Sequence, residues 1–228
     1  MTQIKHAINE EYKSEVFLMD CMEGMKQFAD NHFDLAVVDP PYGIGEDGLK
    51  NHSRGNKAAP TMYKPKNWDR SVPDIDYFKE LKRVSKNQVI WGANHFVQNI
   101  TSANSSCWIV WDKLNGDNDF ADCELAWTSF KTSVRKYTFR WAGMLQGNMS
   151  NKETRIHPTQ KPCALYDWIF SNYATEGQKI LDTHLGSQSS RISANKNKLH
   201  FTGFELDPDY FRDGNKRYED HVSQLTLF

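Results

Sequence analysis

The fold is decided by ten residues, FDLAVVDPPY at positions 33–42. The run Phe33–Val38 is apolar except for Asp34, which is typical of a strand buried on both faces in the parallel sheet of an α/β domain. Two prolines cannot continue a central strand, because each fixes its backbone and lacks an N–H. The chain must therefore turn out of the sheet at the carboxyl end of this strand, where open α/β sheets place their ligands.

The turn itself offers groups that suit a planar amine. Asp39 and the carbonyl of Pro40 can accept hydrogen bonds, Pro41 stiffens the turn, and Tyr42 can stack on a flat ring. The exocyclic amine of a nucleobase fits such a set. Taken alone, however, the four residues are more simply interpreted as a rigid turn that ends a strand.

Three later segments make the motif far more specific. They are HPTQKP at 157–162, ILDTHLGS at 180–187 and FTGFELD at 201–207. Together with DPPY they resemble, in sequence and in order, the motifs of β-class DNA amino-methyltransferases, and DPPY is the form typical of N6-adenine enzymes. The resemblance extends over residues 15–218, nearly the whole chain.

The resemblance implies an α/β fold with a Rossmann-like, seven-stranded, mostly parallel methyltransferase sheet. Its order is circularly permuted, with the catalytic half before the cofactor half. Hydrophobic periodicity agrees, since βαβ units flank a series of consecutive strands. We expect strands at 16–20, 33–38, 88–94, 107–111, 124–130, 137–141, 178–182 and 200–205, and helices at 21–31, 74–86, 163–173, 187–197 and 208–222. Residues 1–228 suit one domain, with a small target-recognition region at 113–156 that includes a loop at 143–154.

The implied activity is transfer of a methyl group from S-adenosylmethionine to the N6 amine of an adenine flipped out of double-stranded DNA. Asp39, Pro40, Pro41 and Tyr42 would be the catalytic residues. Hydrogen bonds to Asp39 and to the Pro40 carbonyl would aim the amine lone pair, and the carboxylate would stabilise the positive charge that develops on nitrogen. The methyl donor is already activated, so no metal is expected.

The resemblance also indicates which residues bind the cofactor. Glu205 suits the ribose hydroxyls, because it ends a strand and follows Asp182 at a spacing close to that of the dinucleotide fingerprint. Asp20 ends the strand before the catalytic one, although an N-cap role is equally plausible. The predicted set is Asp20, His157, Thr159, Lys161, Asp182, His184, Gly186, Ser187 and Glu205.

Gln188 departs from the family pattern, which has glycine at this position of the cofactor loop. If the position needs a positive φ, glutamine is strained there by about 1–3 kcal/mol. A large side chain could also crowd the cofactor. The departure therefore predicts an intact fold with lowered cofactor affinity.

Two basic stretches, 50–70 and 131–161, stand out in a chain whose net charge is −1. Phosphate binding needs a local basic surface rather than a basic protein. Without the neighbouring motifs, each stretch would be interpreted as a solvated loop. With them, we predict DNA binding by Lys50, Arg54, Lys57, Lys64, Lys66, Arg135, Lys136, Arg140, Lys152 and Arg155.

The cysteine content favours a protein that resides in the reducing interior of a cell. The four cysteines are scattered, so the sequence predicts neither a zinc site nor a disulfide framework. No apolar run is long enough to span a membrane. We expect a cytoplasmic protein of a bacterial or phage-infected cell. Members of the resembled family are often dimers, and a homodimer is left open.

Alternative functions differ in how much of the pattern they explain. N4-cytosine methylation uses the same pocket logic, although that family more often carries Ser-Pro-Pro-Tyr. A methyltransferase fold that binds DNA or cofactor with impaired turnover is suggested by Gln188. A nicotinamide-dependent oxidoreductase is disfavoured, because no G-x-G-x-x-G follows a strand.

Overall fold

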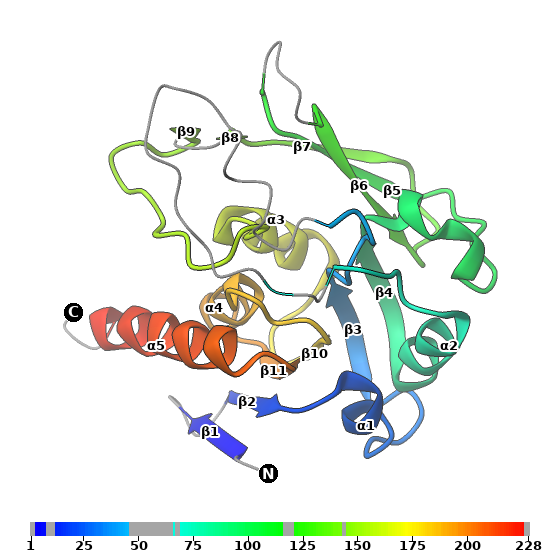
Figure 1. The fold of residues 1–228 in the computed structure, drawn as a ribbon, viewed down its shortest axis with the longest axis horizontal. Coiled ribbons are helices and arrows are strands. Elements are labelled where there is room, and N and C mark those ends of the chain that lie inside the picture. The colour runs from blue at the N-terminus through cyan, green and yellow to red at the C-terminus, as the bar shows by residue number, and fades with distance from the viewer. Residues whose placement is uncertain are drawn as a thin grey trace.

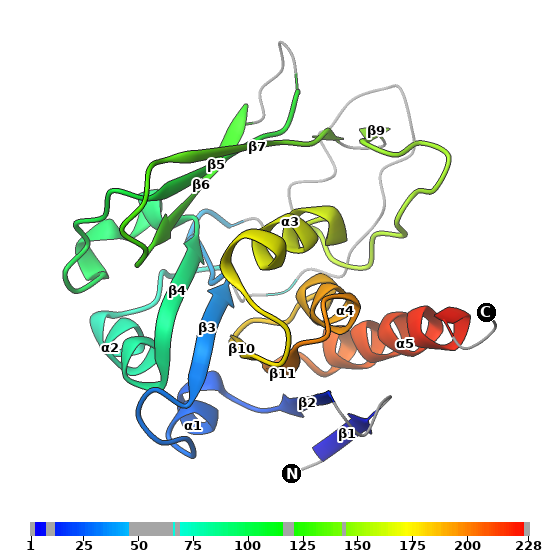
Figure 2. The ribbon, with the colours of Figure 1, turned by 180° about the vertical axis from the view of Figure 1, so that it is seen from behind.

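The computed structural model describes residues 3–7, 12–45, 66, 69–115, 121–142 and 145–225. In this part of the chain a twisted sheet runs through the middle of the molecule, and helices cover both of its faces (Figure 1). Helices α1 (Cys21–Met25) and α2 (Ile75–Val84) lie on one face. The other face carries α3 (Cys163–Tyr173), α4 (Ser189–Lys196) and α5 (Pro208–Leu225), as the view from behind also shows (Figure 2).

Within the described residues the sheet has nine strands, in the spatial order β1-β2-β11-β10-β3-β4-β6-β5-β7. They are β1 (Gln3–Ala7), β2 (Lys13–Leu18), β3 (Phe33–Val38), β4 (Ser85–Trp91), β5 (Trp108–Asp112), β6 (Cys123–Thr128), β7 (Arg135–Thr138), β10 (Lys179–Asp182) and β11 (His200–Glu205). β1 runs antiparallel to β2, and β6 antiparallel to both β4 and β5, whereas the other adjacent pairs are parallel. The predicted α/β class, with a mostly parallel sheet, is confirmed.

Seven of the eight predicted strands are those from β2 to β5 in this order, the eighth is the edge strand β7, and β1 is an additional strand at the other edge. β1 escaped prediction because its sequence, QIKHA, has too few apolar residues to indicate a strand. β7 begins two residues before the predicted 137–141 strand. The predicted loop at 143–154 contains β9 (Leu145–Gln146), which pairs with β8 (Trp141–Ala142) in a small separate hairpin.

The helices follow local signals at their ends. Asp74 caps α2 by accepting hydrogen bonds from two backbone N–H groups of its first turn. α3 has its predicted bounds, but α1 ends at Met25 instead of continuing to residue 31. The N–H groups of Gln27 and Phe28 bond to carbonyls three residues back, so the chain tightens into turns there. Two short 3₁₀ helices, η2 (Ala93–His95) and η3 (Val97–Asn99), follow β4. None of the described helices is long and apolar enough to cross a bilayer.

Strand alternation divides the core into two halves. Leu35 and Val37 pack into a cluster with α3, α4 and α5, whereas Ala36 and Val38 pack into a cluster with α1 and α2. Successive side chains of a strand point to opposite faces, and both faces are covered. This explains why the run in β3 is apolar almost throughout rather than alternating with polar residues.

The permuted order brings the two halves of the sequence together at one edge. β3 lies beside β10, with Leu35 opposite Ile180 and Ala36 opposite Leu181. β10 in turn lies parallel to β11. Because parallel strands end at the same edge of a sheet, the turn after β3 and the loops after β10 and β11 lie together.

Candidate active site

Asp39 lies at the end of β3 and is held from two sides. The Tyr42 hydroxyl donates to its Oδ1 at 2.7 Å, and the Lys161 ammonium donates to its Oδ2. Lys161 Nζ also lies 3.1 Å from the Tyr42 hydroxyl oxygen. The turn therefore presents a carboxylate oriented by its own tyrosine and by a lysine from the 157–162 segment.

The ring of Tyr42 packs over Gly92 and against His95. It stacks on the imidazole of His95, with ring centres 5.0 Å apart and planes inclined by 16°. A Cβ atom at Gly92 would lie 2.0 Å from the Tyr42 ring, and Gly92 has a φ of +66°. Only glycine fits both constraints. The stacking of Tyr42 on a base stays a prediction, since its partner in this structure is His95.

A second carboxylate, missed by the sequence analysis, shares Lys161. Glu124 of β6 lies with its Oε2 3.2 Å from Lys161 Nζ, and its Oε1 contacts the ammonium of Lys113. The side chain of Lys161 is only 5% exposed. The four charges alternate in sign, so the buried ammonium is paired on both sides. The available signal for Glu124 was a charged residue within a predicted strand. Buried charges are seldom unpaired, so a glutamate there indicates a charged partner.

These contacts change the interpretation of Lys161 and set the charges of the cluster. Lys161 was assigned to the cofactor on resemblance, but its ammonium lies on the carboxylate of Asp39. Burial raises the pKa of Asp39, and the neighbouring ammonium opposes that rise. Burial also acts to raise the pKa of Glu124, but Lys161 and Lys113 outweigh it and lower that pKa to about 2. Glu124 is therefore a carboxylate at any pH at which the protein functions.

Asp182 ends β10 and is almost fully buried. Its Oδ1 accepts a hydrogen bond from the backbone N–H of His184 at 3.0 Å, and its Oδ2 accepts one from the Ser190 hydroxyl at 2.5 Å. Burial raises the pKa of Asp182 to about 7, although both hydrogen bonds lower it. The carboxyl group thus ties the loop after β10 to the first turn of α4.

Glu205 joins the end of β11 to the same loop. Its Oε2 accepts the backbone N–H of Gly186 at 2.8 Å, and its Oε1 accepts that of Asp207 at 2.8 Å. Gly186 has a φ of +47°, and the nearest atom to its missing Cβ position belongs to His157, at 3.6 Å. The carbonyl of the buried Ser187 accepts a hydrogen bond from Arg217 of α5 at 2.7 Å. The predicted cofactor residues Gly186, Ser187 and Glu205 are therefore brought together.

Two histidines and a threonine line the same region. The His157 ring lies edge-on to Tyr210, with ring centres 4.2 Å apart, and its Nδ1 accepts the backbone N–H of Thr159 at 3.3 Å. Burial, with the charge of Lys161 adding to it, lowers the pKa of His157 to about 3. Burial lowers the pKa of His184 to about 4. Both imidazoles are neutral at neutral pH and add no charge to the site.

Asp20 follows β2, which lies beside β11 in the sheet. Its Oδ1 accepts the backbone N–H groups of Met22 at 2.8 Å and Glu23 at 3.3 Å, so it caps α1. The N-cap role is thus the one that the structure shows. A contact of Asp20 with the cofactor stays a prediction.

Gln188 has the positive φ that the glycine pattern predicts, at 59°, but its side chain does not crowd the loop. The amide is fully buried against α5. Its nitrogen donates to Asn215 Oδ1 at 3.1 Å, and its oxygen accepts from Arg191 at 2.9 Å. A Cβ at Gly214 would lie 2.7 Å from Gln188 Cγ. Gly214 therefore makes room for the glutamine; crowding of the loop is not seen, the backbone strain remains, and lowered cofactor affinity stays a prediction.

The predicted DNA-binding residues separate into three groups. Lys50, Arg54, Lys57 and Lys64 lie outside the described residues. Lys66 pairs with Asp207 at 2.5 Å and Asp209 at 2.9 Å, and Lys136 pairs with Asp112 at 2.8 Å. Lys66 therefore pairs with the acids at the start of α5 in this structure, and its contact with DNA phosphate stays a prediction.

The remaining basic residues lie along β7 and the β8–β9 hairpin. Arg135, Arg140 and Lys152 are exposed. Arg155 is half-buried, with its guanidinium carbon 4.3 Å from the centre of the Trp141 ring. The stretch 135–155 therefore carries exposed basic side chains, and its contact with DNA stays a prediction.

The chain is similar to known proteins over most of its length. A family model described as DNA methylase matches residues 126–216, which include the segments around Lys161, Asp182 and Glu205. The Type II methyltransferase M.HinfI of Haemophilus influenzae is 23% identical over 261 residues, and the match covers 95% of this chain and 71% of that protein.

Solved structures share the fold. The M1.HpyAVI–SAM complex superposes with a TM-score of 0.57 at 19% identity, covering 89% of this chain and 97% of the other. PvuII DNA methyltransferase, which is cytosine-N4-specific, superposes with a TM-score of 0.58 at 11% identity, covering 92% of each chain. At these identities the likeness concerns the arrangement of the chain.

Burial of Asp182 predicts a specific pH dependence of stability. Its pKa is about 7 in the folded protein and about 3.9 in an unfolded chain. The folded state thus binds a proton more tightly, so stability falls as pH rises from about 4 to about 7. Asp182→Asn removes this titration. Urea unfolding across this range should show a smaller loss of stability in the variant than in the parent protein, and parallel curves would contradict the assignment.

The fit of Gln188 against Gly214 predicts that the effect of Gly214→Ala on the free energy of unfolding depends on residue 188. Gly214→Ala alone should destabilise by about 1–3 kcal/mol, because its methyl group overlaps the glutamine. In the Gln188→Gly background the same change should be neutral or stabilising by up to about 1 kcal/mol, since alanine favours a helix over glycine. Urea unfolding of the four proteins measures this cycle. Equal effects in both backgrounds would show that the two positions are independent.

Proposed function

Because this chain belongs to the DNA amino-methyltransferases, we propose that it transfers a methyl group from S-adenosylmethionine to the N6 amine of adenine in double-stranded DNA. The observation that carries the proposal is the position of Asp39. It is a carboxylate at the end of β3, oriented by Tyr42 and Lys161, beside the loops of β10 and β11.

The residues after β10 and β11 suit the cofactor. Gly186 lacks a Cβ at a point where the backbone has a positive φ, which leaves a place for close approach to a ligand. The carboxylate of Glu205, at the end of the neighbouring strand, suits ribose hydroxyls. Asp182, Gly186, Ser187 and Glu205 would hold S-adenosylmethionine, which supplies an activated methyl group on a positively charged sulfur.

The catalytic work of the protein is to prepare a poor nucleophile. The lone pair of an aromatic amine is delocalised into its ring. Hydrogen bonds from the two N–H groups to Asp39 and to the Pro40 carbonyl favour a pyramidal nitrogen with a directed lone pair. As the nitrogen receives the methyl group, the donor sulfur would keep the electron pair of the broken S–CH₃ bond and lose its charge. The carboxylate of Asp39 would stabilise the positive charge on nitrogen, and the excess proton would then pass to solvent water.

Adenine is favoured over cytosine by the aspartate of DPPY. The alternative, N4-cytosine methylation, is supported by the shared fold of the cytosine-N4-specific PvuII enzyme. Asp39 can accept a hydrogen bond from either amine. The choice between adenine and cytosine therefore depends on the pocket that surrounds the base. The 113–156 region, which includes β7 and the small hairpin, is the segment that we assign to target recognition.

Asp39→Asn tests the assignment directly. The change keeps the shape of the side chain and removes the charge, so methyl transfer should fall at least ~10²-fold, while S-adenosylmethionine should bind as tightly as before. Mass-spectrometric analysis of nucleosides from DNA incubated with protein and methyl donor identifies N6-methyladenine, N4-methylcytosine or neither. Equal activity in variant and parent would remove Asp39 from the mechanism, and N4-methylcytosine would establish the alternative.

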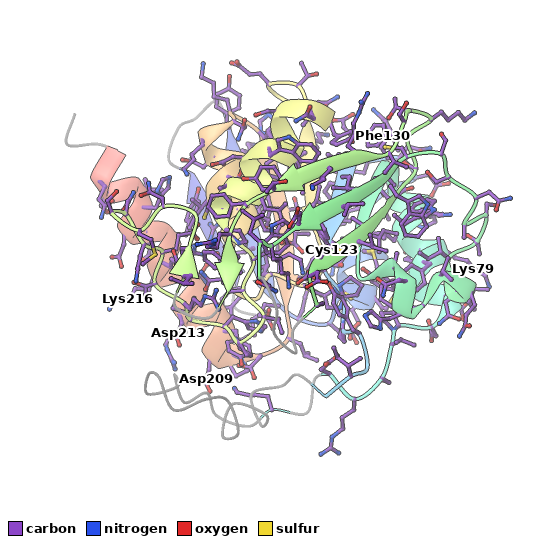
Figure 3. All side chains as sticks on the ribbon, turned by 90° about the horizontal axis from the view of Figure 1, so that it is seen from above. Lys79, Cys123, Phe130, Asp209, Asp213 and Lys216 are labelled. Atoms are coloured by element: carbon purple, nitrogen blue, oxygen red, sulfur yellow. The ribbon has the colours of Figure 1, made fainter. Side chains whose placement is uncertain are left out.

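The 135–155 surface predicts the salt dependence of DNA binding. Arg135→Gln combined with Arg140→Gln should weaken binding and reduce the slope of log affinity against log salt by roughly 0.9 for each phosphate that the protein no longer neutralises. Figure 3 shows Lys79 on α2 at the side of the molecule opposite Lys216 of α5. Lys79→Gln, which removes an exposed charge on α2, outside the 135–155 stretch, is the matched control. An unchanged slope in the double variant would exclude this surface.

A further inference from the structure

We propose that Lys161 and Glu124 are positioning residues for Asp39: the Lys161 ammonium, held between the two carboxylates, keeps Asp39 ionised and oriented toward the target amine, and the charge of Glu124 opposes that ionisation. The proposal rests on the proposed function and goes beyond it, because it assigns roles to a lysine outside the DPPY turn and to a glutamate on β6.

The ammonium of Lys161 is surrounded by two carboxylates, a hydroxyl group and two aromatic rings. It bridges the carboxylates of Asp39 and Glu124 and also lies 3.1 Å from the Tyr42 hydroxyl. Its Nζ is 5.5 Å from the centre of the Tyr42 ring and 5.6 Å from that of Trp91. Such a lysine is held in one position, unlike a surface lysine that moves in solvent.

Glu124 provides the second half of this arrangement. It lies on β6, the strand that runs antiparallel between β4 and β5, and its Oε2 lies 3.2 Å from Lys161 Nζ. Lys113, which follows β5, contacts its other oxygen. Glu124 is therefore a fixed anion, and Lys161 cannot leave it without exposing a buried charge.

The groups around Asp39 determine whether its carboxyl group is ionised, and Lys161 provides the positive charge among them. The titratable groups that face Asp39 from the described elements are Glu124, Asp182, Tyr42, Tyr77, Tyr166 and Lys161. The neutral His157 faces Lys161. Burial and the charge of Glu124 raise the pKa of Asp39, and the Lys161 ammonium lowers it. Lys161 is thus the cation that opposes protonation of Asp39.

Ionisation of Asp39 matters because the target amine must donate to it. A protonated carboxyl group keeps less acceptor capacity and carries no charge, so it cannot stabilise the cation that forms on nitrogen. The acid limb of the rate profile therefore reports the charge of Asp39. The pH at which this acid limb falls distinguishes a positioning role of Lys161 and Glu124 from a merely structural role.

The two positions should shift that limb in opposite directions. Lys161→Met removes the cation, so the acid limb of single-turnover methyl transfer should move up by about 1–3 pH units. Glu124→Gln removes the competing anion and leaves Lys161 to Asp39, so the limb should move down. Lys161→Arg keeps the charge and should leave the limb near that of the parent. Lys86→Met breaks an ion pair with Asp34 at the other end of β3 and should not move it.

A direct titration decides the proposal even where a variant is inactive. Carboxyl resonances of protein labelled with ¹³C-aspartate are followed against pH, and Asp39→Asn identifies the Asp39 signal. Its midpoint should rise in Lys161→Met and fall in Glu124→Gln. No shift, or shifts in the same direction, would overturn the proposal. If the parent protein methylates neither base, the proposed function fails, whereas this titration still tests the charge coupling.

Discussion

The rest of the structure depends on the parallel pairing of β3 with β10. Asp34, the polar residue in the apolar run of β3, fixes that pairing at its amino end. Its carboxylate accepts the backbone N–H of Lys179, at the start of β10, at 2.9 Å, and the ammonium of Lys86, in β4, at 2.6 Å. A slip of one residue would turn every side chain to the opposite face. With the register fixed, the end of β3 and the end of β10 reach the same edge of the sheet, and two distant halves of the sequence form one site.

The site treats its two buried aspartates differently, and the difference follows from their partners. Asp39 has an ammonium within contact, so its charge is supported despite burial. Asp182 is held by a hydroxyl and a backbone N–H, and its pKa rises to about 7. The first environment suits the proposed role of Asp39, which is to accept a hydrogen bond from the target amine as a carboxylate. The second environment holds Asp182 in place through its bonds to the loop after β10 and to α4.

The sequence predicts well where the signal is local. β3, α3 and β11 have their expected bounds, because apolar runs and prolines mark them. The edge strand β1 and the short hairpin of β8 and β9 are decided by pairing with neighbours, which no local pattern shows. The same division holds in the site. The turn after Val38 was predictable from two prolines, whereas the contact of Lys161 with Glu124 arises only when β6 is placed beside β4.

Gln188 shows why a departure from a family motif must be judged by its surroundings. A glutamine at a φ of 59° is strained, yet its amide completes a buried cluster between α4 and α5. Arg191 donates to Gln188 at 2.9 Å, to Asn215 at 2.8 Å and to Ser14 at 2.7 Å, and its guanidinium lies 3.7 Å from the Tyr218 ring. These bonds engage two of the three guanidinium nitrogens and so offset part of the cost of burying the arginine. The loop before α4 is therefore held by α5 through Gln188, so the glutamine is accommodated by contacts that a glycine could not make.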